Sequence, residues 1–536
     1  MNWDEQYDVV VIGSGLSGLA GGLTAAKEGA RSVVLEKAGS LGGSTSYSYG
    51  LLWIGNNSLA RQKGYNDSRK EIHAYMTSLG GHQIDSKRLD AYIDHSILAL
   101  EYFLDAGVRL RLSRGVHDHY LGVAPGAKEE GRTVEAELIS GQELGPWQDS
   151  ILLPETTPFR VNAEEAVAWG GVESVDHWDA ATMRQREVTD MRGMGVGLVT
   201  QFVKCLLDHE VTIQLGVAAE RLIMDGPRVA GVATLDGRQL EAKRGVILAT
   251  GGYESNPELV KAFEEWPHFE SQFPASVNGD GLILGTEIGA AVRIVHNNLA
   301  TMLGFSVDMK GDPPRKAFRV AGIIELCSPH TLVVNGEGNR FADESYFQSL
   351  APTLRDYDCM SHDHRNLPCF LIFDRQFVEK YSFAGMPAGS SMPEWVVQAD
   401  TLPALAKNLD VAPSGLSTTV ERFNGFAEHG VDHDFRRGEQ RWMLARATKP
   451  TKNRSLGPLN KPPFYGIELK PTGLGSAGLS TNEYGQVLHV RGRPIDGLYA
   501  SGNVSAHTEY GVGYQAGYSL ASGMTFSWLA AKHMLK

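Results

Sequence analysis

Length, composition and charge exclude several classes of protein. The chain has 536 residues, of which 42% are hydrophobic and 21% are charged, so it is neither disordered nor collagen-like. A chain of this length forms roughly two to four domains. Fifty basic and 63 acidic residues give a formal net charge of −13, which disfavours nucleic acid as a partner.

Cysteine spacing and the N-terminus set the expected compartment. The four cysteines show no C-x-x-C or paired spacing, so we expect reduced core thiols, no metal site and no covalent haem. They are Cys205, Cys327, Cys359 and Cys369. No apolar stretch approaches the roughly 20 residues of a spanning helix, and no signal peptide precedes the first strand. The sequence therefore predicts a cytoplasmic protein without a membrane span.

The N-terminal segment has the pattern of a nucleotide-binding βαβ unit. Residues 7–12 (YDVVVI) form a short apolar run that is typical of a parallel strand buried on both faces. G-S-G-L-S-G follows, and then a predicted helix. Gly13 permits a tight turn, Gly15 lets a pyrophosphate approach the backbone, and Gly18 lets helix and strand pack closely. Glu36 ends the second strand, where an acid accepts hydrogen bonds from ribose hydroxyls. The unit predicts a dinucleotide site at a helix N-terminus.

Further elements follow along the chain. We expect amphipathic helices over 57–105, an irregular insertion over 106–190, a helix over 195–208, strands in VTIQLG, RVAGVATLDG, GVILATGG and GLYASGN, and a final helix over 515–535. The predicted fold class is α/β. A Rossmann-like FAD-binding domain (1–277 and 466–536) holds an inserted α+β catalytic domain (278–465) that caps the substrate.

Three further segments favour FAD over NAD. A second Gly/Ser loop, Leu41–Thr45, follows Glu36 closely and suits a longer ligand. Ala249–Gly252 and Gly502–Asn503 each lie at the end of another predicted strand. Strand ends that converge on one ligand are the expected crevice of an open α/β sheet.

Several motifs together carry a family resemblance. They are VVVIGSGLSG, LGGST, ILATGG, NGDG (278–281), VVNGEGNRFADES (333–345) and GLYASGN. With these motifs the chain resembles the FAD-dependent flavoproteins that include fumarate reductase flavoproteins and 3-ketosteroid dehydrogenases. The resemblance implies FAD extended across the first domain, with the second domain closing over the flavin ring. The cofactor contacts expected are Gly13, Ser14, Gly15, Leu16, Ser17, Gly18, Glu36, Lys37, Gly42, Gly43, Ser44, Thr45, Ala218, Ala249, Thr250, Gly251, Gly252, Asp280, Gly502, Asn503, Ala516, Gly517, Ser519 and Leu520. We expect Asp280 to cap or orient a helix N-terminus rather than to act in catalysis.

The subgroup follows from what the motifs contain and lack. Fumarate reductases place an Arg before the paired glycines over the flavin, whereas residues 513–520 read GYQAGYSL and 325–330 read ELCSPH. A dicarboxylate substrate is therefore poorly supported. The chain is more similar to 3-ketosteroid Δ1-dehydrogenases, through HDHYLGVAPG (117–126), DESY (343–346) and GNVSAHTEYGVG (502–513), in which Glu509 is inserted.

This resemblance implies a dehydrogenase acting on CH–CH groups, which forms a C=C bond next to the ketone of a cyclic or steroid substrate. A hydride leaves the β-carbon for flavin N5, and a proton leaves the α-carbon, which is acidic only when the carbonyl is polarised. Tyr346 is the expected base and Tyr120 its helper. Tyr510 and the backbone N–H of Gly513 would hold the ketone oxygen. His119 and His507 are alternative acid/base groups.

Competing functions remain open at this point. The same hydride and proton positions serve the reverse reaction, reduction of an activated alkene such as an enone or a fumarate-reductase-like enoate. An RNA-binding flavoprotein is disfavoured by the charge of −13 and by the lack of a basic cluster. A pure electron carrier does not explain a large capping domain. No haem or iron–sulfur motif is present, so electrons must leave to a separate acceptor, such as a quinone, oxygen or a redox protein.

Overall fold

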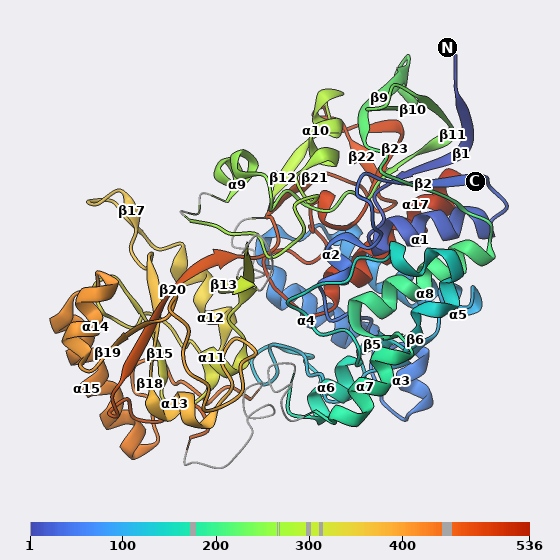
Figure 1. The fold of residues 1–536 in the computed structure, drawn as a ribbon. Helices are drawn as coiled ribbons and strands as arrows, with labels where there is room; N and C mark the ends of the chain where they lie inside the picture. The colour runs from blue at the N-terminus through green and yellow to red at the C-terminus, as the bar shows by residue number, and fades with distance from the viewer. Residues whose placement is uncertain are drawn as a thin grey trace.

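A computed structural model describes residues 2–171, 178–264, 266, 268–295, 302–309, 315–441 and 453–536. The chain folds into two lobes that lie side by side (Figure 1). The first lobe holds both termini and the second lies to its lower left. We use "first lobe" for β1 to β12 with β21 to the C-terminus, and "second lobe" for β13 to β20.

The sheet of the first lobe follows the order β22–β23–β10–β11–β1–β2–β8, and β9 pairs with β10. Its strands are β1 (Glu5–Ile12), β2 (Ser32–Glu36), β8 (Thr212–Leu215), β9 (Ala219–Asp225), β10 (Arg228–Thr234), β11 (Gln239–Leu248), β22 (Gln486–Leu488) and β23 (Pro494–Ala500). Strands β8, β2, β1, β11 and β23 are parallel, pair by pair. All five residues of β2 are buried, as expected for a strand covered on both faces. The strands predicted in YDVVVI, VTIQLG, RVAGVATLDG, GVILATGG and GLYASGN are confirmed.

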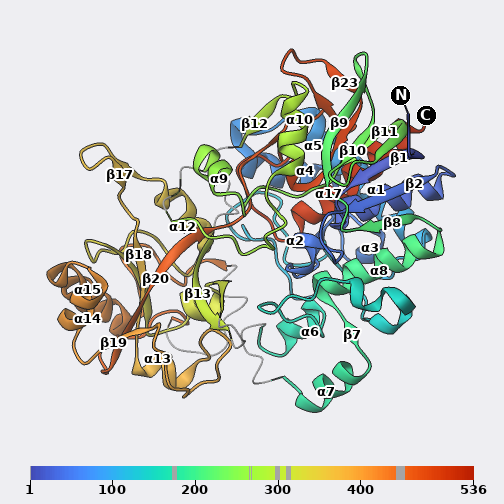
Figure 2. The ribbon, with the colours of Figure 1, turned by 45° about the horizontal axis from the view of Figure 1, so that its top comes forward.

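Helices of the first lobe pack beside this sheet (Figure 2). Helix α1 (Leu16–Lys27) contacts both α17 (Tyr518–Met534) and α8 (Met194–Asp208), and α17 also contacts α5 (Ser86–Asp105). The predicted helices over 195–208 and 515–535 are confirmed. The predicted helical region 57–105 holds α3 (Ser58–Gln62), α4 (Arg69–Gly80) and α5.

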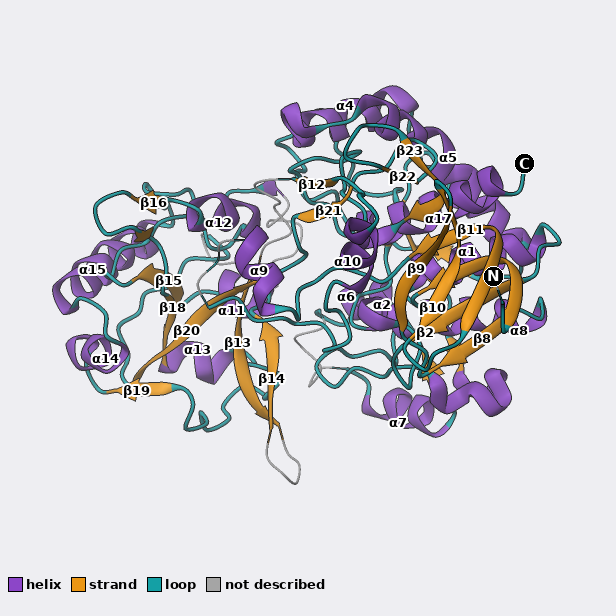
Figure 3. Cartoon of the chain, turned by 90° about the horizontal axis from the view of Figure 1, so that it is seen from above, coloured by secondary structure: helices purple, strands orange, loops and turns teal. Residues whose placement is uncertain are grey.

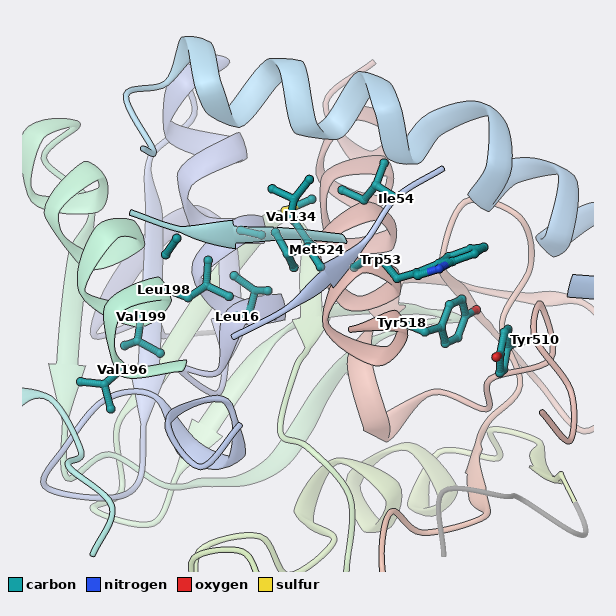
Figure 4. Packing of buried hydrophobic residues seen from close by; sticks show 14 of the residues in the cluster. Leu16, Trp53, Ile54, Val134, Val196, Leu198, Val199, Tyr510, Tyr518 and Met524 are labelled. Carbon is teal, nitrogen blue, oxygen red and sulfur yellow. The ribbon is translucent and has the colours of Figure 1, made fainter. Parts of the chain in front are cut away.

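A continuous apolar core joins these helices to the site described below. Leu16 of α1 and Met524 of α17 are fully buried within it. Figure 4 shows the same cluster running past Trp53 to the stacked rings of Tyr518 and Tyr510. The core therefore extends without a break from the first βαβ unit to the C-terminal loop.

The region 106–190, predicted to be irregular, holds only short elements between loops. They are β4 (Leu110–Leu112), β5 (Thr133–Ala136), β6 (Ile139–Ser140), the 3₁₀ helix η2 (Gly141–Ser150), α6 (Ala163–Ala168) and α7 (Ala180–Val188). Strand β3 (Leu52–Trp53) pairs with β5, and β7 (Met191–Arg192) pairs with β6.

The second lobe is built on an antiparallel sheet, which Figure 3 shows apart from the first sheet. Its order is β14–β13–β20–β18–β15, and β19 pairs with β20. Its elements are β13 (Met302–Met309), β14 (Arg315–Val320), α11 (Ile323–Cys327), β15 (Thr331–Asn335), α12 (Phe347–Leu354), β16 (Tyr357–Asp358), β17 (Asp363–His364), β18 (Cys369–Asp374), α13 (Arg375–Lys380), β19 (Val397–Ala399), α14 (Leu402–Leu409), α15 (Pro413–His429) and β20 (Phe464–Thr472).

The chain passes from the first lobe to the second after Ile294 and returns after Thr472. After the predicted domain boundary 277/278, α10 (Asp280–Glu287) contacts β9, and β12 (Val292–Ile294) pairs with β21 (Ala477–Leu479), so both stay in the first lobe. On the return, the predicted boundary 465/466 falls inside β20, whose whole length lies in the second lobe's sheet.

Two smaller expectations concern thiols and membranes. Cys205, Cys327 and Cys369 are buried thiols, but Cys359 is exposed, so the expectation of a core position is wrong for Cys359. It lies between β16 and β17, a pair of two-residue strands that covers little of the chain.

Among the described residues, none of the helices combines the length and apolar character that crossing a membrane requires.

Candidate active site

The ends of four parallel strands meet at a cavity of about 670 Å³ between the lobes. Gly13 follows β1, Lys37 follows β2, Ala249 follows β11 and Ser501 follows β23, and all four residues line this cavity. Parallel strands bring their carboxyl ends to the same edge of a sheet, which explains why segments nearly 500 residues apart in sequence meet here. We call this space the interlobe cavity.

In the glycine turn before α1, neighbouring backbone segments come as close to Gly13 and Gly18 as the spacing of the glycines predicts. Gly13 has a φ of +104°, and a Cβ there would lie 2.4 Å from the carbonyl oxygen of Ala249. A Cβ on Gly18 would lie 1.9 Å from the carbonyl oxygen of Gly13, so only glycine permits this contact of helix and turn. Gly15 is the N-cap of α1 and has no side-chain cap. Its nearest neighbour at the Cβ position is the Thr45 hydroxyl at 3.5 Å, so this backbone faces the interlobe cavity.

Polar groups tie this turn to the second strand. The Glu36 carboxylate accepts hydrogen bonds from the Ser14 hydroxyl (2.6 Å), the Ser14 backbone N–H (3.1 Å) and the Ala38 N–H (2.8 Å). A carboxylate has about four acceptor positions, so Glu36 keeps capacity for a ligand hydroxyl. The Ser14 hydroxyl also accepts from the Gly42 N–H at 3.1 Å. The expected role of Glu36 is thus compatible with its bonds to the protein.

Most of the expected cofactor contacts lie on the interlobe cavity. They are Gly13, Ser14, Gly15, Leu16, Ser17, Glu36, Lys37, Gly43, Ser44, Thr45, Ala249, Thr250, Gly251, Asp280, Gly502, Asn503, Ala516, Gly517, Ser519 and Leu520. Four do not line it. Gly18 packs on Gly13, Gly42 donates to Ser14, Ala218 lies between the lining residues Val217 and Ala219, and Gly252 lies against the Glu254 carboxylate.

Asp280 lies in the first turn of α10, at the helix N-terminus as expected, but it is not the cap. Gly279 is the N-cap of α10, and Asp280 is its first residue. The Lys37 ammonium donates to the Asp280 carboxylate at 2.5 Å and to the Asn278 side chain at 2.6 Å. The carboxylate therefore pairs with Lys37, which follows β2, and does not accept from a backbone N–H of the helix.

The residues that line the interlobe cavity fit FAD. Helices α1, α10 and α17 all begin at the interlobe cavity, and each N-terminus favours an anion such as a diphosphate. The Cβ positions of Gly13 and Gly18 are filled by backbone, and the turn leaves its own backbone open to the ligand. Glu36 supplies acceptors for a ribose. The volume lies within the roughly 300–1,000 Å³ of known ligand sites.

Two segments of the cavity wall were not predicted from the sequence. Residues 154–160 line it from the irregular insertion, and Phe318, Arg319 and Val320 of β14 line it from the second lobe. Only a family alignment would give a signal for them, because loop and hairpin residues carry no periodic pattern.

Two of the expected catalytic tyrosines lie together, although neither lines the interlobe cavity. The rings of Tyr120 and Tyr346 are perpendicular, with centroids 6.3 Å apart. The Tyr346 hydroxyl donates to the backbone carbonyl of His119 at 3.2 Å, and the Tyr120 hydroxyl accepts from the Tyr514 N–H at 3.4 Å. Burial raises the pKa of Tyr346, and it raises that of Tyr120 although the Tyr514 N–H partly offsets this.

A buried ion pair holds the segment that carries Tyr120. The Asp118 carboxylate accepts from Arg132 Nη1 and from Trp53 Nε1, both at 2.8 Å. Both charged side chains are almost fully buried. Because buried partners of this kind allow few alternative geometries, Tyr120 is held by the core rather than by a free loop.

The third tyrosine lines a second, smaller cavity of about 30 Å³, together with Gly513. This cavity adjoins the interlobe cavity, because Leu474, Tyr514 and Ser519 line both. The Tyr510 hydroxyl is buried and has no hydrogen-bond partner among the described residues. Burial raises its pKa well above the ordinary value, so the phenol keeps its proton.

The two candidate histidines have different surroundings. His119 is buried, and its ring lies 5.2 Å from the ring of Tyr514. His507 lies within hydrogen-bond distance of Glu509 (3.4 Å) and of Asn503 (3.1 Å). His507 is thus bound into a polar network, whereas His119 packs against the tyrosines.

Comparisons with known proteins agree with this geometry. Residues 8–523 match the FAD binding domain family. The chain is 32% identical to 3-oxosteroid 1-dehydrogenase of Mycobacterium tuberculosis (99% of this chain, 98% of the relative) and 33% identical to 4-oxocyclohexanecarboxylate 2-dehydrogenase of Sinomonas cyclohexanicum (98% and 92%). The solved structure of 3-ketosteroid Δ1-dehydrogenase from Sterolibacterium denitrificans with 1,4-androstadiene-3,17-dione superposes with a TM-score of 0.87 at 28% identity, over 99% of each chain. The chain therefore belongs to the FAD binding domain family and is an FAD-dependent oxidoreductase.

Proposed function

We propose that this protein is a dehydrogenase that forms a carbon–carbon double bond next to the ketone of a cyclic substrate. Relatives that act on 3-oxosteroids and on 4-oxocyclohexanecarboxylate support the ring ketone as the substrate class. Electrons then leave to a separate acceptor, such as a quinone, oxygen or a redox protein. We further propose a cytoplasmic location.

FAD, held at the glycine turn, Glu36 and Thr45, would supply the hydride acceptor. The protein's own part is to polarise the ketone and to take the α-proton. Negative charge grows on the ketone oxygen as the α-proton leaves, so a donor aimed at that oxygen lowers the barrier.

The buried Tyr510 hydroxyl is the observation that carries the proposal. A buried polar group without a partner costs about 1–3 kcal/mol, so such a group calls for an explanation. A ketone oxygen is an acceptor of the right kind. The Tyr510 phenol is protonated at neutral pH, as an ordinary tyrosine is, and burial raises its pKa further; the side chain lines a cavity that adjoins the FAD site.

Tyr346 is the proposed base, with Tyr120 as its helper. Their perpendicular rings are neighbours, and the Tyr514 N–H stabilises negative charge on the Tyr120 oxygen. Burial raises the pKa of both phenols, so the deprotonated fraction is small at neutral pH. We therefore expect turnover to rise with pH through the alkaline range, because the phenolate fraction grows.

A second candidate is reduction of an activated alkene, which is the same chemistry in reverse. That reaction needs a proton donor where dehydrogenation needs a base, and the buried phenol of Tyr346 holds its proton at neutral pH. Both candidates use the same residues, so only the direction of electron flow separates them.

An anaerobic titration of the FAD-loaded protein tests the proposal. The yellow protein is mixed with androst-4-ene-3,17-dione and, separately, with cyclohexanone, and the visible flavin band is followed. We expect bleaching by at least one ketone. No bleaching by either, together with rapid reoxidation of dithionite-reduced flavin by an enone, would replace dehydrogenation with alkene reduction.

A further inference from the structure

Arg319 brings a positive charge from the second lobe to the interlobe cavity. It lies on β14, where it pairs with Phe305 of β13, and it lines the cavity with Phe318 and Val320. Gly385, which also lines the cavity, leaves room for the guanidinium, because a Cβ at Gly385 would lie 3.3 Å from Arg319 Nη1. The guanidinium of Arg319 thus lies at the cavity wall beside Gly385.

The guanidinium of Arg319 has no partner among the residues that the structure describes. Its Nε is buried without a hydrogen-bond acceptor, and among the described residues it forms no ion pair with a carboxylate. The other cations on the cavity are paired: Lys37 with Asp280 at 2.5 Å, and Arg160 with Asp190 at 3.5 Å. A buried donor of a charged group that lacks an acceptor is costly, which points to a missing anion.

We infer that Arg319 binds the carboxylate of the substrate, so the substrate class is a small cyclic ketone that carries an acid group. This inference rests on the proposed function. A guanidinium matches a carboxylate with two parallel hydrogen bonds, which fixes orientation as well as adding affinity. Phe318, Val320 and Met302 line the same cavity, and their apolar side chains suit the ring carbons of such a substrate.

The diphosphate of FAD is the alternative anion that Arg319 could bind in this cavity. The N-terminus of α1 already supplies the glycine turn and open backbone for that group. Arg319 comes instead from the antiparallel sheet of the second lobe, and it shares its wall with apolar side chains. The experiment therefore measures bound FAD alongside substrate affinity.

The test compares an acid with its uncharged analogue. KM and kcat are measured for 4-oxocyclohexanecarboxylate and for its methyl ester, with wild type, Arg319→Gln and Arg319→Lys. Dissociation constants for cyclohexanecarboxylate, which lacks the ketone, are measured by calorimetry. Lys316→Gln is the matched control, since Lys316 is exposed on the same strand and does not line the cavity.

Loss of a charge-assisted pair predicts a KM for the acid that is about 10- to 100-fold higher in Arg319→Gln. The KM for the ester should change less than about threefold, and bound FAD and the Lys316→Gln control should match wild type. Arg319→Lys should recover part of the affinity, because the charge remains but the fork is lost. Weaker binding of cyclohexanecarboxylate to Arg319→Gln would support the same conclusion without turnover.

Four results would overturn the inference. Equal losses for acid and ester would make Arg319 a packing residue, and loss of bound FAD would assign it to the cofactor. Oxidation of androst-4-ene-3,17-dione by wild type without any oxidation of the acid would leave the proposed function standing and remove the acid. If no ketone of either kind bleaches the flavin, the proposed function fails and the inference falls with it.

Discussion

Replacing Glu509 by glutamine tests how far a buried ion pair holds the loop over the active site. Arg88 donates to Glu509 Oε2 through Nε at 3.0 Å and Nη2 at 2.8 Å, and both side chains are at most 1% exposed. The Ser522 hydroxyl donates to the other oxygen at 2.6 Å. The Phe526 ring lies 3.9 Å from the guanidinium. This network joins α5, α17 and the loop that carries Tyr510.

The expected loss of stability follows from burial. Glu509→Gln removes the negative charge and leaves the Arg88 guanidinium buried without a counter-charge, which costs about 3–5 kcal/mol. Removing both charges in Arg88→Met/Glu509→Leu should cost much less, because no unpaired charge remains in the core. The double variant is therefore expected to be more stable than Glu509→Gln.

The pair also has a pH signature. Burial by itself would raise the pKa of Glu509, but Arg88, His507 and Ser522 more than offset it, so the pKa lies well below the ordinary 4.5. A lowered folded-state pKa gives stability that is complete above about pH 4.5 and is lost as the pH falls below it. Glu509→Gln lacks this contribution, so its stability should change less with pH in the acid range.

Urea unfolding of the FAD-loaded protein, followed by tryptophan fluorescence at pH 7 and at pH 4, measures both effects. Glu101→Gln serves as the control, since Glu101 is exposed on α5, the helix that carries Arg88. A Glu509→Gln variant within about 1 kcal/mol of wild type would refute the magnitude taken for a buried pair. A double variant as unstable as the sum of its two single variants would refute the reasoning about the unpaired charge.

Three further expectations concern the cofactor turn, the ketone donor and a buried acid. Gly18→Ala should lose FAD on gel filtration, because the new Cβ would lie 1.9 Å from the Gly13 carbonyl oxygen. Gly39→Ala is the control and should retain FAD, because a Cβ there meets nothing within 4 Å. Equal FAD content in the two variants would contradict this expectation. Tyr510→Phe should keep or slightly raise the unfolding temperature, because an unpaired buried hydroxyl is removed, and should lower kcat by about 10²-fold; an unchanged kcat would remove Tyr510 from catalysis. Burial raises the pKa of Glu254 to about 7, so between pH 4.5 and 7 the folded state holds a proton that the unfolded state has lost, and stability falls as pH rises. Glu254→Gln should therefore be more stable than wild type at pH 8, by roughly 3 kcal/mol at most, and equal at pH 4; a difference that is larger at pH 4 would have the wrong sign.

The FAD half of the site could be predicted from short segments of sequence. The apolar run before Gly13, the spacing to Gly18 and the acid at Glu36 all lie within 30 residues, and local sterics and hydrogen bonding decide their geometry. Parallel strands then bring Thr250 and Gly502 to the same edge. Local sequence was not enough for one detail: Asp280 was expected to cap or orient a helix N-terminus, and it lies in the first turn of α10, but Gly279 is the cap and Lys37, which follows β2, pairs with the carboxylate.

The tertiary structure alone decided where the chain changes lobes and which residues of the second lobe line the interlobe cavity. The sequence of β20 does not show which sheet it joins, and its partners β13, β18 and β19 assign it to the second lobe. The pairing of Arg88 with Glu509 spans 421 residues, and Arg319 reaches the cavity only because the lobes pack together. A local sequence pattern reports which side of a helix or strand is buried, but contacts between distant segments depend on how whole elements pack, and that information is not local.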